Sequence, residues 1–205
     1  MPRQARFLKD HGYYHIFSRS VNRTWIFKDP EDFHTFRSLV HRAKQAFPLH
    51  LFHYAFMNTH FHFVLQAIRK EHVAKNLAYI KWHYTQWMRK KYGWRGPLWR
   101  ERFKSLPIEN ELYLAACGLY VEYNPLRAGL CGDPANYPYS SARKYLKGSE
   151  DALLDDYHAP ALPPILQSLA RIPGVGIADA FFAGSTAIGP QHFLSSPAPR
   201  CLSPR

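Results

Sequence analysis

Two apolar runs lie almost back to back near the start of the chain, residues 50–57 (HLFHYAFM) and 61–67 (FHFVLQA). Only Asn58, Thr59 and His60 separate them. Runs of this length, rich in aromatic residues and joined by a short polar connection, are typical of two strands with a tight turn between them. The sequence therefore predicts a β-hairpin here.

Strands and helices are predicted on both sides of the hairpin. Residues 12–19 predict a first strand and residues 98–107 a fourth. Helices are predicted over 30–46, over 71–92, from Asn110 to Pro125, and more briefly near 139–147. Their ends carry the expected signals, which are Asp29 and Asn110 as N-caps, Pro30 at a first helical position, and Gly93 and Pro125 as C-terminal stops.

The predicted order is strand, helix, strand, strand, helix, strand, helix. This order favours an α+β fold of the ferredoxin-like (split βαβ) type, an antiparallel sheet with helices on one face. We expect residues 1–150 to form this domain and residues 151–205 to form a proline-rich C-terminal appendage. Within the appendage, residues 164–184 resemble a helix-hairpin-helix turn, with a helix-capping glycine turn as the alternative, and disorder is expected beyond residue 190.

Charge and composition narrow the classes of function. Lys and Arg outnumber Asp and Glu by 27 to 15, which gives a formal net charge of +12 and favours a polyanionic partner. The three cysteines lie far apart, which excludes a zinc ribbon and indicates a reducing compartment. No signal peptide and no run of 18 apolar residues is present, so we expect a cytoplasmic protein with no membrane partner.

His60-Phe61-His62 is the first candidate for chemistry. Residues two apart on a strand point to the same side, so both imidazoles are expected to project together while Phe61 faces the other way. Two imidazoles with the rest of the coordination shell open can hold a divalent ion that also binds a substrate oxygen. A His-x-His pair also occurs by chance, so the motif alone does not establish a metal site.

Tyr120 and Asn124 form the second candidate. They lie at i and i+4 of the predicted helix and share one face. A tyrosine hydroxyl can attack a phosphate when a metal stabilises the developing charge, and an amide oxygen one turn later can join the metal shell. The spacing fits a core aromatic followed by an ordinary helix stop equally well, and both interpretations stay open at this point.

Four segments together resemble the REP-associated tyrosine transposases, which belong to the single-tyrosine HUH transposases of insertion sequences. The segments are SRSVNRTWIF, MNTHFHFVLQ, GPLWRERFKS and YVEYNPLRAGL. They occur in the family's order, and the resemblance runs from about Tyr13 to Lys147.

The resemblance implies a metal-dependent enzyme that cleaves and rejoins single-stranded DNA at palindromic hairpins such as REP sequences. It implies His60, His62 and Asn124 as ligands of Mg²⁺ or Mn²⁺ and Tyr120 as the nucleophile. The nucleophile would form a 5′-phosphotyrosine intermediate and release a 3′-hydroxyl, whose attack reverses the link and recombines strands. The implied partner is single-stranded DNA with a hairpin, bound by a monomer or a homodimer.

The chain departs from the family pattern in two places. The family usually has a proline before the asparagine of its histidine motif, where this chain reads Met57-Asn58-Thr59. It commonly has a histidine and an aliphatic residue before the Asn-Pro pair, where this chain has Glu122 and Tyr123. Tyr123 is a second phenol, but on an ideal helix it lies about 60° short of a full turn from Tyr120. Tyr120 therefore remains the expected nucleophile.

A basic segment lies between residues 81 and 104. It contains one acid, Glu101, and eight basic residues: Lys81, Arg89, Lys90, Lys91, Arg95, Arg100, Arg102 and Lys104. Five of the aromatic residues interleaved with them are Trp82, Tyr84, Trp87, Trp94 and Trp99. The pattern indicates a groove that follows a nucleic-acid backbone and stacks bases, although a solvated charged face is the alternative. By motif order, Arg19, Arg23 and Arg127 are expected to contact phosphates as well.

Three other functions fit parts of this pattern. A non-catalytic module that binds single-stranded DNA or RNA would share the ferredoxin-like fold and the basic surface. A relaxase or replication-initiator nuclease would share the chemistry, but commonly carries further histidines or a second tyrosine. A metal-dependent phosphodiesterase would use water in place of Tyr120.

Overall fold

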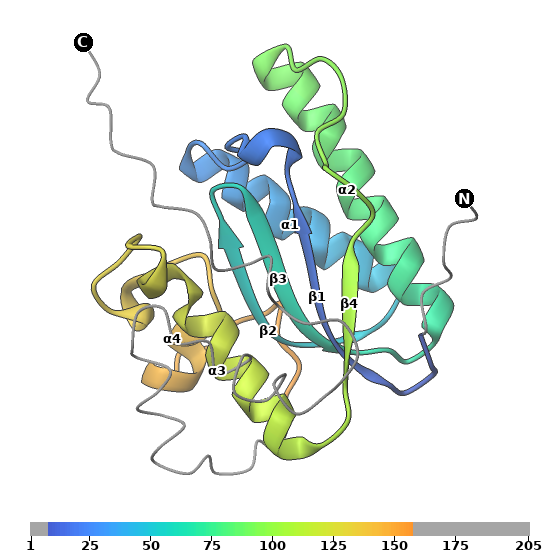
Figure 1. Cartoon of the computed structure of the whole chain (residues 1–205), viewed down its shortest axis with the longest axis vertical. Helices are drawn as coiled ribbons and strands as arrows, with labels where there is room; N and C mark the ends of the chain where they lie inside the picture. The colour runs from blue at the N-terminus through green and yellow to red at the C-terminus, as the bar shows by residue number, and fades with distance from the viewer. Residues whose placement is uncertain (1–7, 158–205) are drawn as a thin grey trace.

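The computed structural model describes residues 8–157. Four antiparallel strands form one sheet in the order β2-β3-β1-β4 (Figure 1). The strands are β1 (Tyr13–Arg19), β2 (His50–Met57), β3 (His60–Gln66) and β4 (Lys104–Ile108). The predicted hairpin is confirmed as β2–β3, and its turn is only Asn58-Thr59 because His60 already pairs with Met57. The helix-hairpin-helix turn and the disorder beyond residue 190 fall outside the described residues.

The helices follow the predicted order. They are α1 (Pro30–Ala46), α2 (Lys70–Tyr92), α3 (Glu111–Arg127) and the short α4 (Ala142–Lys147), with 3₁₀ turns η1 (Val21–Arg23) and η2 (Pro134–Asn136). The Asp29 side chain accepts from the N–H of Asp32, and the Asn110 side chain accepts from the N–H of Tyr113, so both predicted N-caps are confirmed. Gly93 ends α2 with a left-handed φ of 63°, a conformation that glycine adopts without a steric penalty.

The sheet is covered on both faces, which completes the α+β fold. Figure 1 shows α1 and α2 on one side and α3 on the other. Phe61 and Phe63 of β3 pack into the core with α1 and α2, whereas Val64 packs with Cys117 and Val121 of α3. The α+β class and the antiparallel sheet are confirmed. The expectation that the helices share one face holds for α1 and α2 only, because successive residues of β1, β2 and β3 are buried on both faces and each face needs a cover.

The fourth strand is shorter than predicted. β4 begins at Lys104, and the segment from Leu98 to Phe103 is joined to the end of β1 by an isolated bridge between Trp99 and Ser20 and by the bond from Arg100 N to Arg19 O. Leu98 and Phe103 both lie in the core with α1 and α2. Residues five apart on a regular strand face opposite sides, so the chain must break its alternation between them. Pro107 is tolerated in β4 because this strand lies at the edge of the sheet.

The proline of α3 does not stop the helix where the sequence indicated. α3 continues through Pro125 to Arg127. Proline removes only the bond that its own N–H would make, and the carbonyls at the end of α3 find later donors. Ala128 N donates to Asn124 O and Leu130 N to Pro125 O, each at 2.9 Å. The prediction that Pro125 ends the helix is therefore wrong by two residues.

The outer edge of β2 is covered by the end of the described chain. Leu51 N donates to the Asp155 carboxylate at 2.7 Å, and Asp155 N donates to Leu51 O at 2.8 Å. Leu153 is buried in the core, and Asp151 forms an ion pair with Arg37. The packed part of the domain thus extends past the boundary predicted at residue 150, as far as Tyr157.

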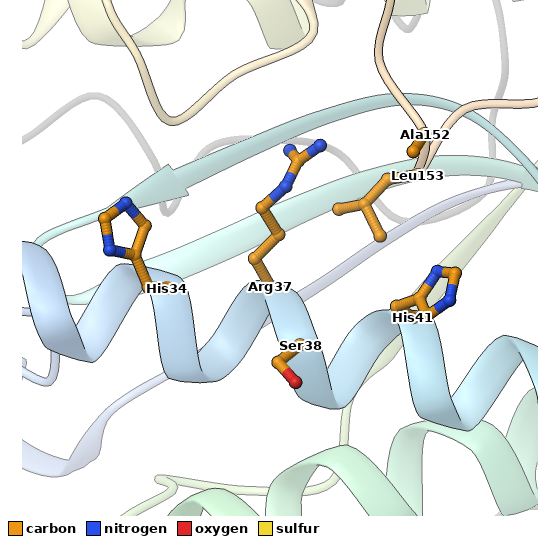
Figure 2. Close-up of a pocket in the computed structure, with 6 residues that line it drawn as sticks. All are labelled: His34, Arg37, Ser38, His41, Ala152 and Leu153. Carbon is orange, nitrogen blue, oxygen red and sulfur yellow. The ribbon is translucent and has the colours of Figure 1, made fainter.

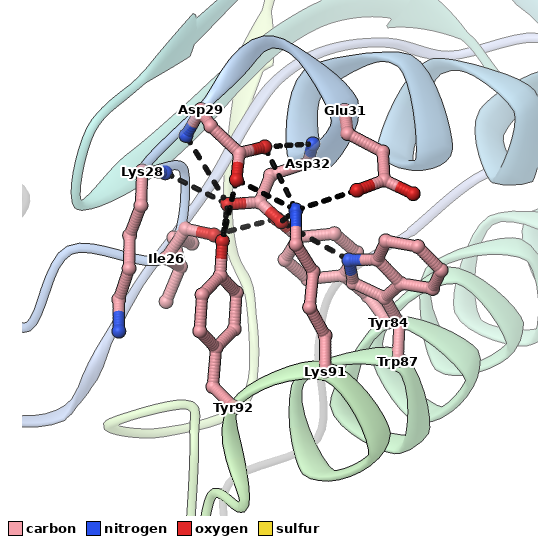
Figure 3. Close-up of polar contacts among 9 residues, drawn as sticks. All are labelled: Ile26, Lys28, Asp29, Glu31, Asp32, Tyr84, Trp87, Lys91 and Tyr92. Atoms are coloured by element: carbon pink, nitrogen blue, oxygen red, sulfur yellow. Dashed lines mark hydrogen bonds and ion pairs between the residues drawn. The ribbon is translucent and has the colours of Figure 1, made fainter.

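An ionic network around the buried Asp32 joins the start of α1 to the end of α2 (Figure 3). Lys91 Nζ of α2 lies 2.7 Å from Asp29, 2.9 Å from Glu31 and 3.0 Å from Asp32. The Asp32 side chain is fully buried and also accepts from Trp87 Nε1 and the Tyr92 hydroxyl. A buried carboxylate with this many donors fixes the two helices against each other.

Candidate active site

The candidate site lies on the sheet face that α3 covers. Alternation along β3 places His60 and His62 on this face, while Phe61 is fully buried on the face of α1 and α2. β1 runs beside β3 with Phe17 opposite His62. This register brings His15 of β1 next to His62.

Three histidines meet here, two of which the sequence indicated. Nε2 of His15 lies 2.9 Å from Nδ1 of His62, and the ring centroids of His60 and His62 are 5.1 Å apart. Sequence reasoning missed His15, because a single histidine in a predicted strand has no spacing signal. Only the pairing of β1 with β3 reveals its neighbour.

Burial keeps these imidazoles neutral. Desolvation lowers the pKa of His15 to about 4, and desolvation with the charge of Arg19 lowers the pKa of His60 to about 3. Desolvation also holds the pKa of His62 well below its ordinary value, and His60 and His15 lower it further. A neutral imidazole offers a lone pair to a metal, which an imidazolium cannot do.

In both His60 and His62, hydrogen bonds engage Nδ1 and leave Nε2 for metal coordination. Nδ1 of His62 is engaged with His15, and Nδ1 of His60 lies 2.9 Å from the Thr59 hydroxyl. Nε2 of each ring is therefore the nitrogen that fits a divalent ion, with its orientation held from behind. Within residues 8–157, no group of three or more His, Cys, Asp or Glu could hold a metal ion. A metal site built on His60 and His62 would therefore take its further ligands from groups other than His, Cys, Asp or Glu, such as an amide oxygen or a substrate oxygen.

Helix α3 brings Tyr120 against the histidines. The centroid of its ring lies 5.8 Å from that of His15 and 6.1 Å from that of His62, edge-on to both. Asn124, one turn later, donates from Nδ2 to the Tyr120 carbonyl at 3.0 Å. This bond leaves Oδ1 as the amide atom suited to a metal. The structure thus brings together the histidine pair and the tyrosine, which lie about sixty residues apart in the sequence.

Two arginines flank Tyr120. Arg127 donates to the Tyr120 carbonyl at 2.7 Å, and its guanidinium carbon lies 4.2 Å from the centroid of the ring. Arg19, which pairs with His60 in the sheet, is partly buried. Burial lowers the pKa of Arg19, the nearby Tyr120 acts to raise it, and the charges of Arg23 and Arg100 lower it further. The site therefore has the positive potential that a phosphate needs.

The two departures on α3 have a structural explanation. Tyr123 is buried at 6% exposure, whereas Tyr120 is partly exposed. Glu122 Oε1 lies 2.7 Å from Nδ1 of His53 in β2 and accepts from the Ser141 hydroxyl at 3.1 Å. Glu122 therefore ties α3 to the sheet through His53, which is not one of the predicted metal ligands.

The basic segment separates into structural and exposed residues. Tyr84 is buried, and Trp87, Trp94 and Trp99 pack against the core. Of the five interleaved rings, Trp82 alone is mostly exposed, at 59%. Lys91 belongs to the network with Asp29 and Asp32, which removes it from the predicted nucleic-acid surface. The exposed basic residues are Arg89, Lys90, Arg95, Arg100, Arg102 and Lys104, while Lys81 donates to Ser18 and to the carbonyl of Glu101.

A shallow depression lies beside α1, apart from His60 and His62, and Figure 2 shows the side chains that line it. It is lined by His34, Arg37, Ser38, His41, Ala152 and Leu153. Arg37 is held there by the Asp151 carboxylate and the Tyr54 hydroxyl. The depression is on the opposite face of the sheet and has no part in the candidate site.

None of the helices between residues 8 and 157 is long and apolar enough to cross a bilayer.

Comparisons with known proteins bear on the family and the fold of the chain. Residues 9–124 match the model of the protein family described as "Transposase IS200 like". None of the curated proteins matches the chain.

Two solved structures are similar to the chain. One is a REP-associated tyrosine transposase bound to a REP hairpin, with 18% sequence identity and a TM-score of 0.62 over 78% of this chain and 98% of that one. The other is a candidate transposase from Deinococcus radiodurans, with 16% identity and a TM-score of 0.41 over 54% of this chain and 88% of that one. The first similarity shows a shared fold.

Proposed function

Because this chain belongs to the IS200-like transposase family, we propose that it cleaves and rejoins single-stranded DNA through a covalent link to Tyr120. The substrate is a DNA strand with a palindromic hairpin, as in the similar structure bound to a REP hairpin. The observation that supports this proposal is the edge-on contact between Tyr120 and the buried, neutral His62, which shares its face of β3 with His60.

The proposed metal ligands are His60, His62 and Asn124, and the ion is Mg²⁺ or Mn²⁺. Two nitrogen ligands and one amide oxygen leave room for phosphate oxygens. When bound, the ion would polarise the phosphoryl group and stabilise the charge that develops on it. His15 and Thr59 hold the two imidazoles in orientation.

Tyr120 is the proposed nucleophile. Its phenolic oxygen forms a bond to the scissile phosphorus while the bond from phosphorus to the 3′-oxygen breaks. The phenolic proton leaves, the 3′-oxygen takes up a proton, and the 5′ end stays linked to the enzyme. Attack on the phosphotyrosine by a 3′-hydroxyl reverses these changes and joins two strands, with no net change in the number of phosphodiester bonds.

The arginines position the substrate in this proposal. Arg19, Arg23 and Arg127 contact phosphates beside the scissile bond, since Arg19 and Arg127 already flank Tyr120. The exposed part of the basic segment follows the DNA backbone further away. It comprises Arg89, Lys90, Arg95, Arg100, Arg102 and Lys104, with Lys81 at its edge and Lys91 left out. A monomer or a homodimer can present this surface.

Covalent capture tests the proposal. The wild-type protein is incubated with a labelled single-stranded hairpin and Mn²⁺, and a denaturing gel shows whether labelled DNA migrates with the protein. We expect an adduct for the wild type and for Tyr123→Phe, and none for Tyr120→Phe. Tyr123→Phe is the matched control because it removes a phenol three residues away on the same helix.

Each alternative function predicts a different result on the denaturing gel. Binding without any adduct would support a module that does not cut. Cleavage without an adduct would support a phosphodiesterase that uses water. An adduct that persists in Tyr120→Phe and disappears in Tyr123→Phe would move the nucleophile by three residues.

A further inference from the structure

The loop between β1 and α1 wraps around the tip of the β2–β3 hairpin, next to His60 (Figure 1). Ser20 N donates to Thr59 O at 2.9 Å. The carbonyl of Asn58 accepts from the N–H of Ile26 at 2.7 Å and from that of Phe27 at 3.2 Å. Since Asn58 and Thr59 directly precede His60, this loop lies at the same end of the sheet as the candidate metal site.

Trp25 in this loop is exposed although its neighbours are deeply buried. Its side chain is 52% exposed, whereas Ile26 and Phe27 are 0% and 1% exposed. The Tyr84 hydroxyl donates to the carbonyl of Ile26 at 2.5 Å, which anchors the loop a second time. The indole is therefore carried on a fixed backbone, and a ligand that contacts it does not have to order the loop first.

The backbone before Trp25 is also held in an unusual conformation. Asn22 and Arg23 have positive φ angles of 50° and 53°. Side chains such as arginine adopt this left-handed region rarely, so tertiary contacts must maintain it. The bonds to the tip of the hairpin are such contacts.

Arginine residues occur on the same loop as Trp25 and beside the candidate site. Arg23, two residues before Trp25, is itself exposed. The charges of Arg23 and Arg100 both act on Arg19, which also interacts with Tyr120. Arg100 N donates to the carbonyl of Arg19 at 3.0 Å, so these two residues are joined through the backbone. An exposed ring on the same short loop as an exposed arginine fits a nucleic-acid strand, whose bases stack on rings and whose phosphates attract guanidinium groups.

We propose that Trp25 stacks on an unpaired base of the single-stranded DNA that flanks the hairpin, while Arg23 contacts the adjoining phosphate. The base must be unpaired, because paired bases within a duplex keep both faces stacked on their neighbours. This inference rests on the proposed function and deepens it, since it assigns the residue that recognises the strand next to the cleavage site.

A binding assay without metal tests this assignment. Two fluorescent DNA hairpins are titrated with protein in EDTA, one with single-stranded tails and one with the same paired stem and no tails. Trp25→Ala should weaken binding of the tailed hairpin by at least about fivefold, the lower limit for the loss of one stacked base. Affinity for the tailless hairpin should change less than twofold. Trp25→Phe should bind the tailed hairpin almost as well as the wild type, because it keeps an aromatic face.

Leu146→Ala is the control for the loss of an exposed apolar side chain, since Leu146 is 44% exposed on α4. It should bind both hairpins like the wild type, and thermal unfolding should be unchanged in all three variants. Equal binding of the tailed hairpin by Trp25→Ala and the wild type would overturn the assignment, and so would an equal loss for both hairpins. If either of these binding results is found while the wild type still forms the covalent adduct in Mn²⁺, only the role of Trp25 is overturned and the proposed function stands. If the wild type binds neither hairpin, the proposed function fails with it.

Discussion

At the scale of single residues, His15 shows what the sequence conceals. The alternation rule was enough to predict that His60 and His62 share a face, because both lie on one strand. His15 lies on another strand and meets His62 only through the β1–β3 register. Pairing between distant strands depends on the whole core, so no local pattern indicated this contact.

His15 also gives the first prediction. It engages Nδ1 of His62, and partners of this kind orient a ligand and tune its basicity. We expect His15→Ala to weaken Mn²⁺ binding about 10- to 100-fold, the usual effect of removing such a partner. Isothermal titration with Mn²⁺ measures the effect. His34→Ala, which removes an exposed histidine from α1, should bind Mn²⁺ like the wild type. Unchanged affinity in His15→Ala would show that His15 has no part in a metal site.

At the scale of elements, the position of α3 decides where Tyr120 lies. The sequence predicted this helix and its N-cap at Asn110, since both depend on neighbouring residues. It did not predict that α3 covers the face opposite α1 and α2. That placement depends on Val64, Phe52 and other residues of the sheet that face α3. The irregular segment before β4 escaped prediction for a similar reason, because burial of Leu98 and Phe103 overrides the local preference for a strand.

Gly118 sets how closely α3 approaches the sheet. A Cβ at this position would overlap the imidazole of His53, which is held by Glu122 and Tyr157 and cannot move aside freely. We expect Gly118→Ala to lower the free energy of unfolding by about 1–3 kcal/mol, as for other overpacked cores. It should also slow covalent capture, because Tyr120 is two residues away. Urea unfolding and the rate of adduct formation are the measurements.

Gly132→Ala is the matched control, since nothing lies within 4 Å of a Cβ there. It should change neither quantity. If Gly118→Ala were as stable as the wild type and formed the adduct at the same rate, the contact with His53 would not limit the position of α3.

Lys91 tests the link between α1 and α2. Without its ammonium, the fully buried Asp32 carboxylate would lose its cation. Removing the cation leaves the buried Asp32 carboxylate uncompensated, so we expect Lys91→Met to lower the free energy of unfolding clearly more than Lys90→Met does. Lys90→Met changes an exposed lysine on the same turn and should change the stability by less than about 0.5 kcal/mol. Equal stability of the two variants, measured by urea unfolding, would contradict the role of this network.

At the scale of the whole molecule, a net charge of +12 accounts for attraction to DNA, but it does not show which part of the surface the DNA follows. The structure narrows the basic segment to its exposed residues and assigns Lys91 to the fold. Composition alone could not make this division, because it depends on which side chains meet carboxylates.

Salt dependence measures which of these charges meet phosphates. If Arg89 and Lys90 both contact the single-stranded DNA, replacing both with alanine should reduce the slope of log K against log salt by about 1.4, at roughly 0.7 per phosphate. The control removes two charges from the other end of α2, in Lys70→Ala/Lys75→Ala. The control should keep the wild-type slope. Equal slopes for both double variants would show that net charge, and not this surface, governs binding.

The central claim is a covalent bond between DNA and the phenolic oxygen of Tyr120. Mass spectrometry of the protease-digested adduct tests it most directly, because it locates the nucleotide on one residue. We expect a nucleotide mass, attached through its 5′-phosphate, on Tyr120 in the peptide that contains residues 120–127. A nucleotide on Tyr123 or on any other residue, or an adduct-free digest after demonstrated cleavage, would contradict it.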